Sequence, residues 1–156
     1  MMTTEQKLDK TIATIFKPSY TGKRKLTYSE FLSNKMLMIR LIRAGVPYSL
    51  FTLIKDITPF TENDWATFLD MSTKSLQRYK QGSKNFKPIH SEKIIEMAEV
   101  TDFGKKVFGD LDKFKLWLNT PNFALGDVKP VNLLSDSYGK ELVMGEITRI
   151  AHGILV

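Results

Sequence analysis

The sequence predicts an all-α protein, and three observations lead to this prediction. Apolar residues recur at spacings of three and four along most of the chain, as they do on the buried face of a helix. The alternation of apolar and polar residues that marks a half-buried strand is nearly absent. Small polar residues that cap helices, together with Gly and Pro residues that end them, divide the chain into segments of helix length.

The first predicted helix covers residues 4–16, and Pro18 ends it. Its predicted apolar face consists of Leu8, Ile12 and Ile15. Residues 19–25 (SYTGKRK) are basic and rich in turn formers, so we expect a flexible linker there. A second helix is predicted over residues 29–44 with Gly45 as its stop. Pro47 suits the first turn of a third helix through Ile57.

Capping residues place the remaining helices. Thr61 and Asp64 form a weakened capping box that opens residues 62–69. Ser72 is predicted to cap residues 73–81 before Gly82, and Ser91 to cap residues 92–108. Asp110 opens a helix to Leu118, turns follow at residues 120–122 and 126–130, and a final helix covers residues 137–152 up to Gly153. The predicted apolar stripe of this last helix is Val143, Ile147, Ile150 and Ile154.

Charge is distributed unevenly along the 156 residues. Residues 1–90 hold 15 Lys and Arg against 7 Asp and Glu, whereas residues 91–156 hold 8 against 10. The first part therefore suits a polyanionic partner, although a merely solubilising lysine-rich surface explains the count equally well. We expect the domain boundary inside or just after the helix at residues 91–108. The predicted division is an N-terminal helical extension (1–39), a helix-turn-helix region (40–100) and a C-terminal domain (101–156).

Residues 62–81 have the layout of a helix-turn-helix: two short helices with a tight turn near Asp70. Its predicted small core is Trp65, Phe68, Leu69, Met71, Leu76 and Tyr79. Gln and Arg make bidentate contacts to base edges, while Lys, Ser and Thr suit phosphates. The candidate base or backbone contacts are Lys74, Ser75, Gln77 and Arg78, with Lys80, Lys84 and Lys87 as phosphate contacts. The alternative is a core helix pair with a solvated outer face.

The sequence contains no pattern that indicates an enzyme. The chain has no cysteine and two histidines, His90 and His152, neither within a metal-ligand pattern, so we expect no metal, no cofactor and no catalytic residues. It has no apolar signal segment and no stretch approaching a membrane span of about 20 residues. We expect a soluble cytoplasmic protein without membrane association.

The segment from residue 110 to residue 153 contains a distinctive series of residues: Trp117-Leu118, Pro121-Asn122, Ala124-Leu125-Gly126, Pro130, Leu133-Leu134, Gly139, Val143, Ile150 and His152-Gly153. Through these residues the segment resembles the C-terminal domain of the Xre/MbcA/ParS antitoxins, the partners of RES-domain toxins. The resemblance begins near Arg40 and is strongest from Phe108 onward. Residues 72–79 (STKSLQRY) resemble the family's Ser-x-Arg-Thr-Leu-x-Arg-Arg pattern, with Lys74 replacing an Arg and Tyr79 replacing the last Arg.

The resemblance implies a type II antitoxin with an Xre-like helix-turn-helix followed by an MbcA/ParS-like toxin-binding domain. Such a protein covers the active site of an NAD-degrading RES toxin, binds operator DNA and represses its own operon as a homodimer. The apolar residues expected in the core of the C-terminal domain are Trp117, Leu118, Leu125, Leu133, Leu134, Val143, Ile147 and Ile150. Asn122 is expected to cap or brace its turn. The candidate toxin contacts are Asp127, Lys129, Arg149, His152, Ile154, Leu155 and Val156. The alternatives are a toxin inhibitor without DNA binding and a stand-alone helix-turn-helix transcription regulator.

Overall fold

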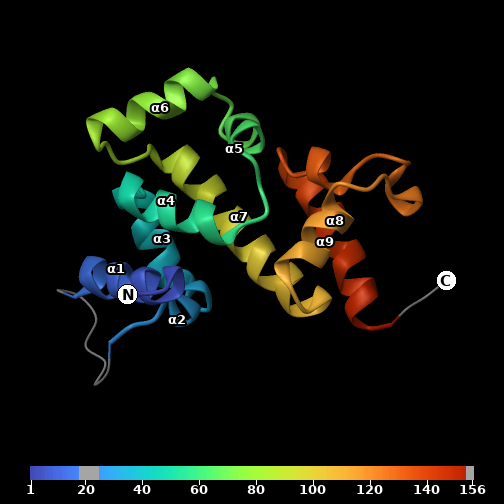
Figure 1. Ribbon diagram of the computed structural model, residues 1–156, viewed down its shortest axis with the longest axis horizontal. Coiled ribbons are helices and arrows are strands. Elements are labelled where there is room, and N and C mark those ends of the chain that lie inside the picture. Colours follow the sequence, from blue (N-terminus) through green and yellow to red (C-terminus); the bar gives the residue numbers. More distant parts are fainter. Residues whose placement is uncertain (18–24, 154–156) are drawn as a thin grey trace. The chain divides into compact units, whose positions relative to one another are not determined.

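The computed structural model describes residues 1–17 and 25–153, and within these residues the regular structure is helical (Figure 1). The α-helices are α1 (Thr4–Phe16), α2 (Tyr28–Leu32), α3 (Lys35–Ala44), α4 (Tyr48–Ile57), α5 (Glu62–Phe68), α6 (Thr73–Gly82), α7 (Pro88–Phe108), α8 (Leu111–Leu118) and α9 (Ser137–Ala151). Two short 3₁₀ helices, η1 (Phe123–Leu125) and η2 (Pro130–Leu133), lie between α8 and α9. The predicted all-α fold class is confirmed. No helix in the described part of the chain is long and apolar enough to cross a membrane.

The chain divides into two compact units. One contains residues 1–58 and 77–98, and the other contains residues 59–76 and 99–156. Helix α7 continues from the first unit into the second, and α6 begins in the second and ends in the first. The three predicted domains, 1–39, 40–100 and 101–156, remain a prediction.

In the first unit, α1 packs against α4 and α2. Its buried residues are Leu8, Ile12 and Phe16, so the predicted face is correct except that Phe16 takes the place of the half-buried Ile15. The ring of Phe16 lies 5.6 Å from that of Phe31 in α2. The backbone N–H of Tyr28 donates to the Asp9 carboxylate at 2.8 Å, which fixes the start of α2 on α1. The predicted linker at residues 19–25 lies outside the described residues except for Lys25.

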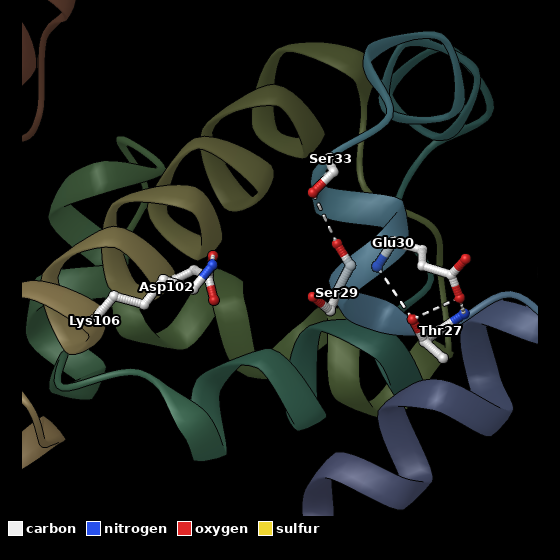
Figure 2. Close-up of polar contacts among 6 residues, drawn as sticks. All are labelled: Thr27, Ser29, Glu30, Ser33, Asp102 and Lys106. Atoms are coloured by element: carbon white, nitrogen blue, oxygen red, sulfur yellow. Dashed lines mark hydrogen bonds and ion pairs between the residues drawn. The ribbon is translucent and has the colours of Figure 1, made fainter.

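The single helix predicted over residues 29–44 is wrong, because α2 and α3 are separate helices. A complete capping box opens α2: the Thr27 hydroxyl accepts from the Glu30 N–H and the Glu30 carboxylate accepts from the Thr27 N–H (Figure 2). Helix α2 ends at Ser33, and the Asn34 side chain then accepts from the Leu37 N–H at 3.2 Å to open α3. Thr and Asn are favoured at such N-caps because their side chains accept hydrogen bonds from backbone N–H groups that have no partner within the helix.

The sequence also placed the start of α7 wrongly. Helix α7 begins at Pro88, three residues before the predicted cap Ser91. Ser91 is completely buried, and its hydroxyl accepts from the Val46 N–H at 2.8 Å and donates to the Phe86 carbonyl at 3.2 Å. Ser91, which the sequence predicted as a local cap, therefore joins two distant segments of the first unit.

Further along α7, the Lys106 ammonium group forms an ion pair with the Asp102 carboxylate one turn earlier, at 2.9 Å (Figure 2).

Other predicted helix ends are confirmed. Gly45 ends α3 with φ of 92°, a conformation that favours glycine, and a Cβ at this position would collide with the carbonyl oxygen of Phe86. Pro47 lies one position before α4, as its N-cap. Asp110 caps α8 by accepting from the Lys113 N–H at 2.7 Å. Asp136, which the sequence analysis did not single out, caps α9 by accepting from the Gly139 N–H.

The second unit has a core built around α8, η2 and α9. Helix α9 packs against η2 and η1, and η2 also contacts α8. The fully buried residues here include Phe114, Leu118, Leu134, Val143 and Ile147. Of the residues predicted for this core, Trp117, Leu125, Leu133 and Ile150 are half-buried instead. Ile154, the last residue of the predicted α9 stripe, lies outside the described residues.

Candidate functional site

Helices α5 and α6 are joined by a turn that the sequence encodes locally. The Thr61 hydroxyl accepts from the Asp64 N–H at 3.1 Å, and the Asp64 carboxylate accepts from the Thr61 N–H at 2.9 Å. After α5, Asp70 adopts a left-handed φ of 50°, and the Ser72 hydroxyl accepts from the Ser75 N–H at 3.0 Å. Both predicted caps are present, so α6 begins at a defined residue.

Apolar side chains hold this pair of helices in place. Four of the six predicted core residues are buried: Trp65, Phe68, Leu69 and Leu76. Trp65 and Phe68 pack edge-on against each other and against Phe60. The other two predicted core residues, Met71 and Tyr79, are half-buried. This packing leaves one side of α6 facing solvent.

The exposed side of α6 carries most of the candidate DNA contacts. Lys74, Gln77 and Arg78 are exposed and fall at positions i, i+3 and i+4, so they share one face of the helix. Lys80 is also exposed, as are Lys84 and Lys87 in the segment between α6 and α7. Ser75 is half-buried, and its hydroxyl accepts a hydrogen bond from the Ser72 hydroxyl at 3.0 Å. The face formed by Lys74, Gln77 and Arg78 is called the cationic face of α6 below.

The structure explains why Tyr79 stands where the resemblance expects arginine. The Tyr79 ring stacks on Phe86 with centroids 4.4 Å apart and an angle of 10° between the planes. Phe86 is buried and also contacts Phe51 and Tyr48. Tyr79 thus anchors the end of α6 on an aromatic cluster, and the helix has one cation fewer to offer a phosphate backbone.

In the second unit, a compact turn presents two of the candidate toxin contacts. The Asn122 N–H donates to the Val128 carbonyl at 3.0 Å, and the Asp127 N–H donates back to the Asn122 carbonyl at 2.9 Å. Asn122 therefore braces its turn through its backbone, and its side chain makes no capping bond to η1. Asp127 has a left-handed φ of 62°, which Asp tolerates better than most residues. The side chains of Asp127 and Lys129 are exposed.

The other candidate toxin contacts lie at the end of α9. Arg149 is exposed and forms an ion pair with Glu146 at 3.6 Å. His152 is exposed at the C-cap, and Gly153 follows with φ of 65°. The remaining candidates, Ile154, Leu155 and Val156, lie outside the described residues.

Sequence reasoning missed the large apolar side chains that face solvent in this unit. Tyr138 is 81% exposed, Leu142 58%, Phe123 88% and Leu116 71%. A signal for two of them was present, because Tyr138 and Leu142 lie on the side of α9 that the buried Val143 and Ile147 leave free. Large exposed apolar groups are the usual anchors of protein interfaces.

Comparison with known proteins identifies both parts of the chain. Residues 37–99 match the family described as the antitoxin Xre-like helix-turn-helix domain. Residues 104–153 match the family described as the antitoxin Xre/MbcA/ParS C-terminal toxin-binding domain.

The chain is also similar to two individual proteins. The chain is 34% identical over 83 residues to the antitoxin Xre of Yersinia enterocolitica serotype O:8 / biotype 1B, a stretch that spans 53% of this chain and 56% of that protein. The chain therefore spans little more than half the length of this curated relative. Its fold is similar to a chain in the crystal structure of the M. tuberculosis MbcT–MbcA toxin–antitoxin complex, with a TM-score of 0.54, 24% identity, and coverage of 68% of this chain and 94% of that one.

The fold and the two matches define a helix-turn-helix protein that carries a toxin-binding type of C-terminal domain. The chain belongs to the Xre/MbcA/ParS family of antitoxins.

Proposed function

We propose that this protein neutralises a RES-domain toxin that consumes NAD, by binding the toxin and covering its active site. The observation that carries the proposal is the order of the two matched domains on one chain, an Xre-like helix-turn-helix followed by a toxin-binding domain. The family resemblance supplies the RES toxin as partner. Asp127, Lys129, Arg149, His152 and the tail residues Ile154, Leu155 and Val156 are the proposed contacts, because the described members of this set are exposed. Both partners would act in the cytoplasm, where NAD is available.

We further propose that the protein represses its own operon. The cationic face of α6 supports this role, because it presents Lys74, Gln77 and Arg78 to solvent. Lys80, Lys84 and Lys87 would contact DNA phosphates. Ser75, which lies near the start of α6, would contact the DNA backbone. A homodimer is proposed because helix-turn-helix proteins usually read two half-sites with two-fold symmetry.

The direct test of neutralisation uses the toxin encoded beside this gene. The purified toxin is mixed with the full-length chain at equimolar concentration, and NAD consumption is followed. We expect consumption to stop and the two proteins to co-elute from a sizing column. A toxin that stays fully active, with the chain intact, would overturn the proposal.

A second candidate, an inhibitor without DNA binding, is favoured by two observations on α6. Lys74 lacks the bidentate fork of arginine, and Tyr79 packs inward on Phe86 where the family pattern has a cation. Titration of the chain against a labelled upstream DNA fragment separates the two candidates. Sequence-specific binding favours the repressor, whereas equal binding to unrelated DNA favours the inhibitor. A stand-alone transcription regulator would bind DNA but leave the toxin active.

A further inference from the structure

One face of α9 exposes an aromatic and an apolar side chain to solvent. Tyr138, Leu142, Gly145 and Arg149 follow one another at spacings of four, three and four, so they line a single side of the helix. Tyr138 is 81% exposed and Leu142 is 58% exposed, whereas Val143 and Ile147 on the other side are completely buried. The residues Tyr138, Leu142, Gly145 and Arg149 are called the outer stripe of α9 below.

Packing within the second unit does not explain why residue 145 is a glycine. The other glycine of this helix, Gly139, is required because a Cβ there would collide with the carbonyl oxygen of Leu133. At Gly145 an added Cβ would meet no atom of the described residues within 4 Å. Glycine in a helix interior makes the helix less stable than alanine does. The glycine at position 145 therefore needs an explanation other than the stability of α9. A glycine on an exposed helix face allows the backbone of another molecule to approach closely.

We propose that the outer stripe of α9 is the main docking surface for the toxin, an inference that rests on the proposed function. Tyr138 and Leu142 would fill an apolar pocket of the toxin, Gly145 would admit a closely packed toxin segment, and Arg149 would pair with a carboxylate at the rim. The toxin is the occupant for two reasons. The stripe lies within residues 104–153, which match a toxin-binding domain. Its combination of Tyr and Arg around an apolar neighbour is the composition of energetic hot spots between proteins.

The first test truncates the stripe. Binding of the full-length chain to the toxin encoded beside its gene is measured by calorimetry for wild type, Tyr138→Ala and Leu142→Ala. Each variant is expected to lose about tenfold or more in affinity, as truncated hot-spot residues do. Ile89→Ala is the control, because Ile89 is an apolar side chain that is 73% exposed but lies in the first unit, outside the toxin-binding domain at residues 104–153. Its affinity should stay within about twofold of wild type.

The second test separates binding from folding. Gly145→Ala and Gly145→Gln introduce better helix formers into open space, so the melting temperature of the free chain should rise by roughly 1–3 °C. The same variants should bind the toxin about tenfold or more weakly, with Gln the weaker of the two because it is larger. A variant that is more stable alone and weaker in the complex cannot owe its loss of binding to unfolding.

Three outcomes would overturn the inference. If the wild type binds the toxin and all stripe variants bind equally well, the docking surface lies elsewhere and the proposed function stands. If Leu142→Ala leaves toxin binding intact but changes the oligomeric state of the free chain in sedimentation, the stripe joins two copies of this chain. If the wild type does not bind the toxin, the proposed function fails and this inference fails with it.

Discussion

Some side chains of this protein form hydrogen bonds that the local sequence does not predict. Ser91 has the spacing of a helix cap, yet it lies inside the first turn of α7 and bonds to Val46, 45 residues earlier. Thr61 and Ser72, by contrast, cap the helices at which the sequence predicted them. A cap is a local interaction, so the sequence predicts it correctly when the side chain bonds to a backbone group three residues away. The prediction fails when the same side chain bonds to a distant segment instead.

Ser91→Ala should destabilise the protein. The substitution leaves the buried Val46 N–H and Phe86 carbonyl without their hydroxyl partner, and an unsatisfied buried donor costs about 1–3 kcal/mol. The free energy of unfolding, from urea titration followed by circular dichroism, measures the loss. Ser49→Ala is the control, because Ser49 is exposed on α4 and should change stability by less than about 0.5 kcal/mol. Equal stabilities for both variants would show that the Ser91 bonds contribute nothing.

Among the elements, α1 and α2 are the ones whose role the sequence could not assign. They precede the matched domains, which begin at residue 37. In the structure, Leu8 and Ile12 of α1 are buried in the core of the first unit, and α1 packs against α4. The N-terminal extension is therefore part of the core that supports the helix-turn-helix region, since α4 belongs to that matched region.

Ile12→Ala tests this structural role. Truncation of a fully buried isoleucine removes apolar contacts and leaves a cavity, at a cost of about 2–5 kcal/mol. Ile89→Ala is the comparison, because Ile89 is 73% exposed in the same unit and its truncation should cost less than about 0.5 kcal/mol. Both are measured by thermal and urea unfolding. A stable Ile12→Ala variant would mean that α1 is dispensable for this core.

Helix α6 is the element on which the proposed repressor role depends. Arg78→Ala removes the exposed guanidinium of the cationic face, so operator binding should weaken by about 1–3 kcal/mol, or roughly 5- to 150-fold. Toxin binding should be unchanged, because the proposed toxin contacts lie beyond residue 120. Gel-shift titration and calorimetry provide the two measurements. Loss of both activities in parallel would indicate misfolding, and retention of DNA binding would remove Arg78 from the interface.

For the whole molecule, the unequal distribution of charge predicts two binding activities with different salt dependence. The basic residues are concentrated before residue 91, where they outnumber acidic residues 15 to 7, whereas acidic residues slightly exceed basic ones after it. DNA binding releases counterions from phosphates, whereas docking through an apolar stripe does not.

Operator affinity should therefore fall steeply as salt rises. A dimer contacting phosphates through Lys80, Lys84 and Lys87 of each copy would neutralise about six phosphates, so affinity should drop about 10³-fold between 50 and 200 mM salt. Toxin affinity should change by less than about tenfold over the same range. Fluorescence anisotropy at several salt concentrations measures both. A flat salt response for DNA would argue against the repressor role.

The sequence by itself determined the all-α class, the local caps at Thr61, Ser72 and Asp110, and the burial of Val143 and Ile147 in α9, because these depend on interactions within one or two helical turns. Tertiary structure alone decided the burial of Ser91, the choice of Phe86 as the stacking partner of Tyr79, and the exposure of Leu116 and Phe123. Each of these depends on which distant segment covers a side chain. Helical periodicity shows which residues share a face, but whether a neighbour covers that face is settled only by the folded chain.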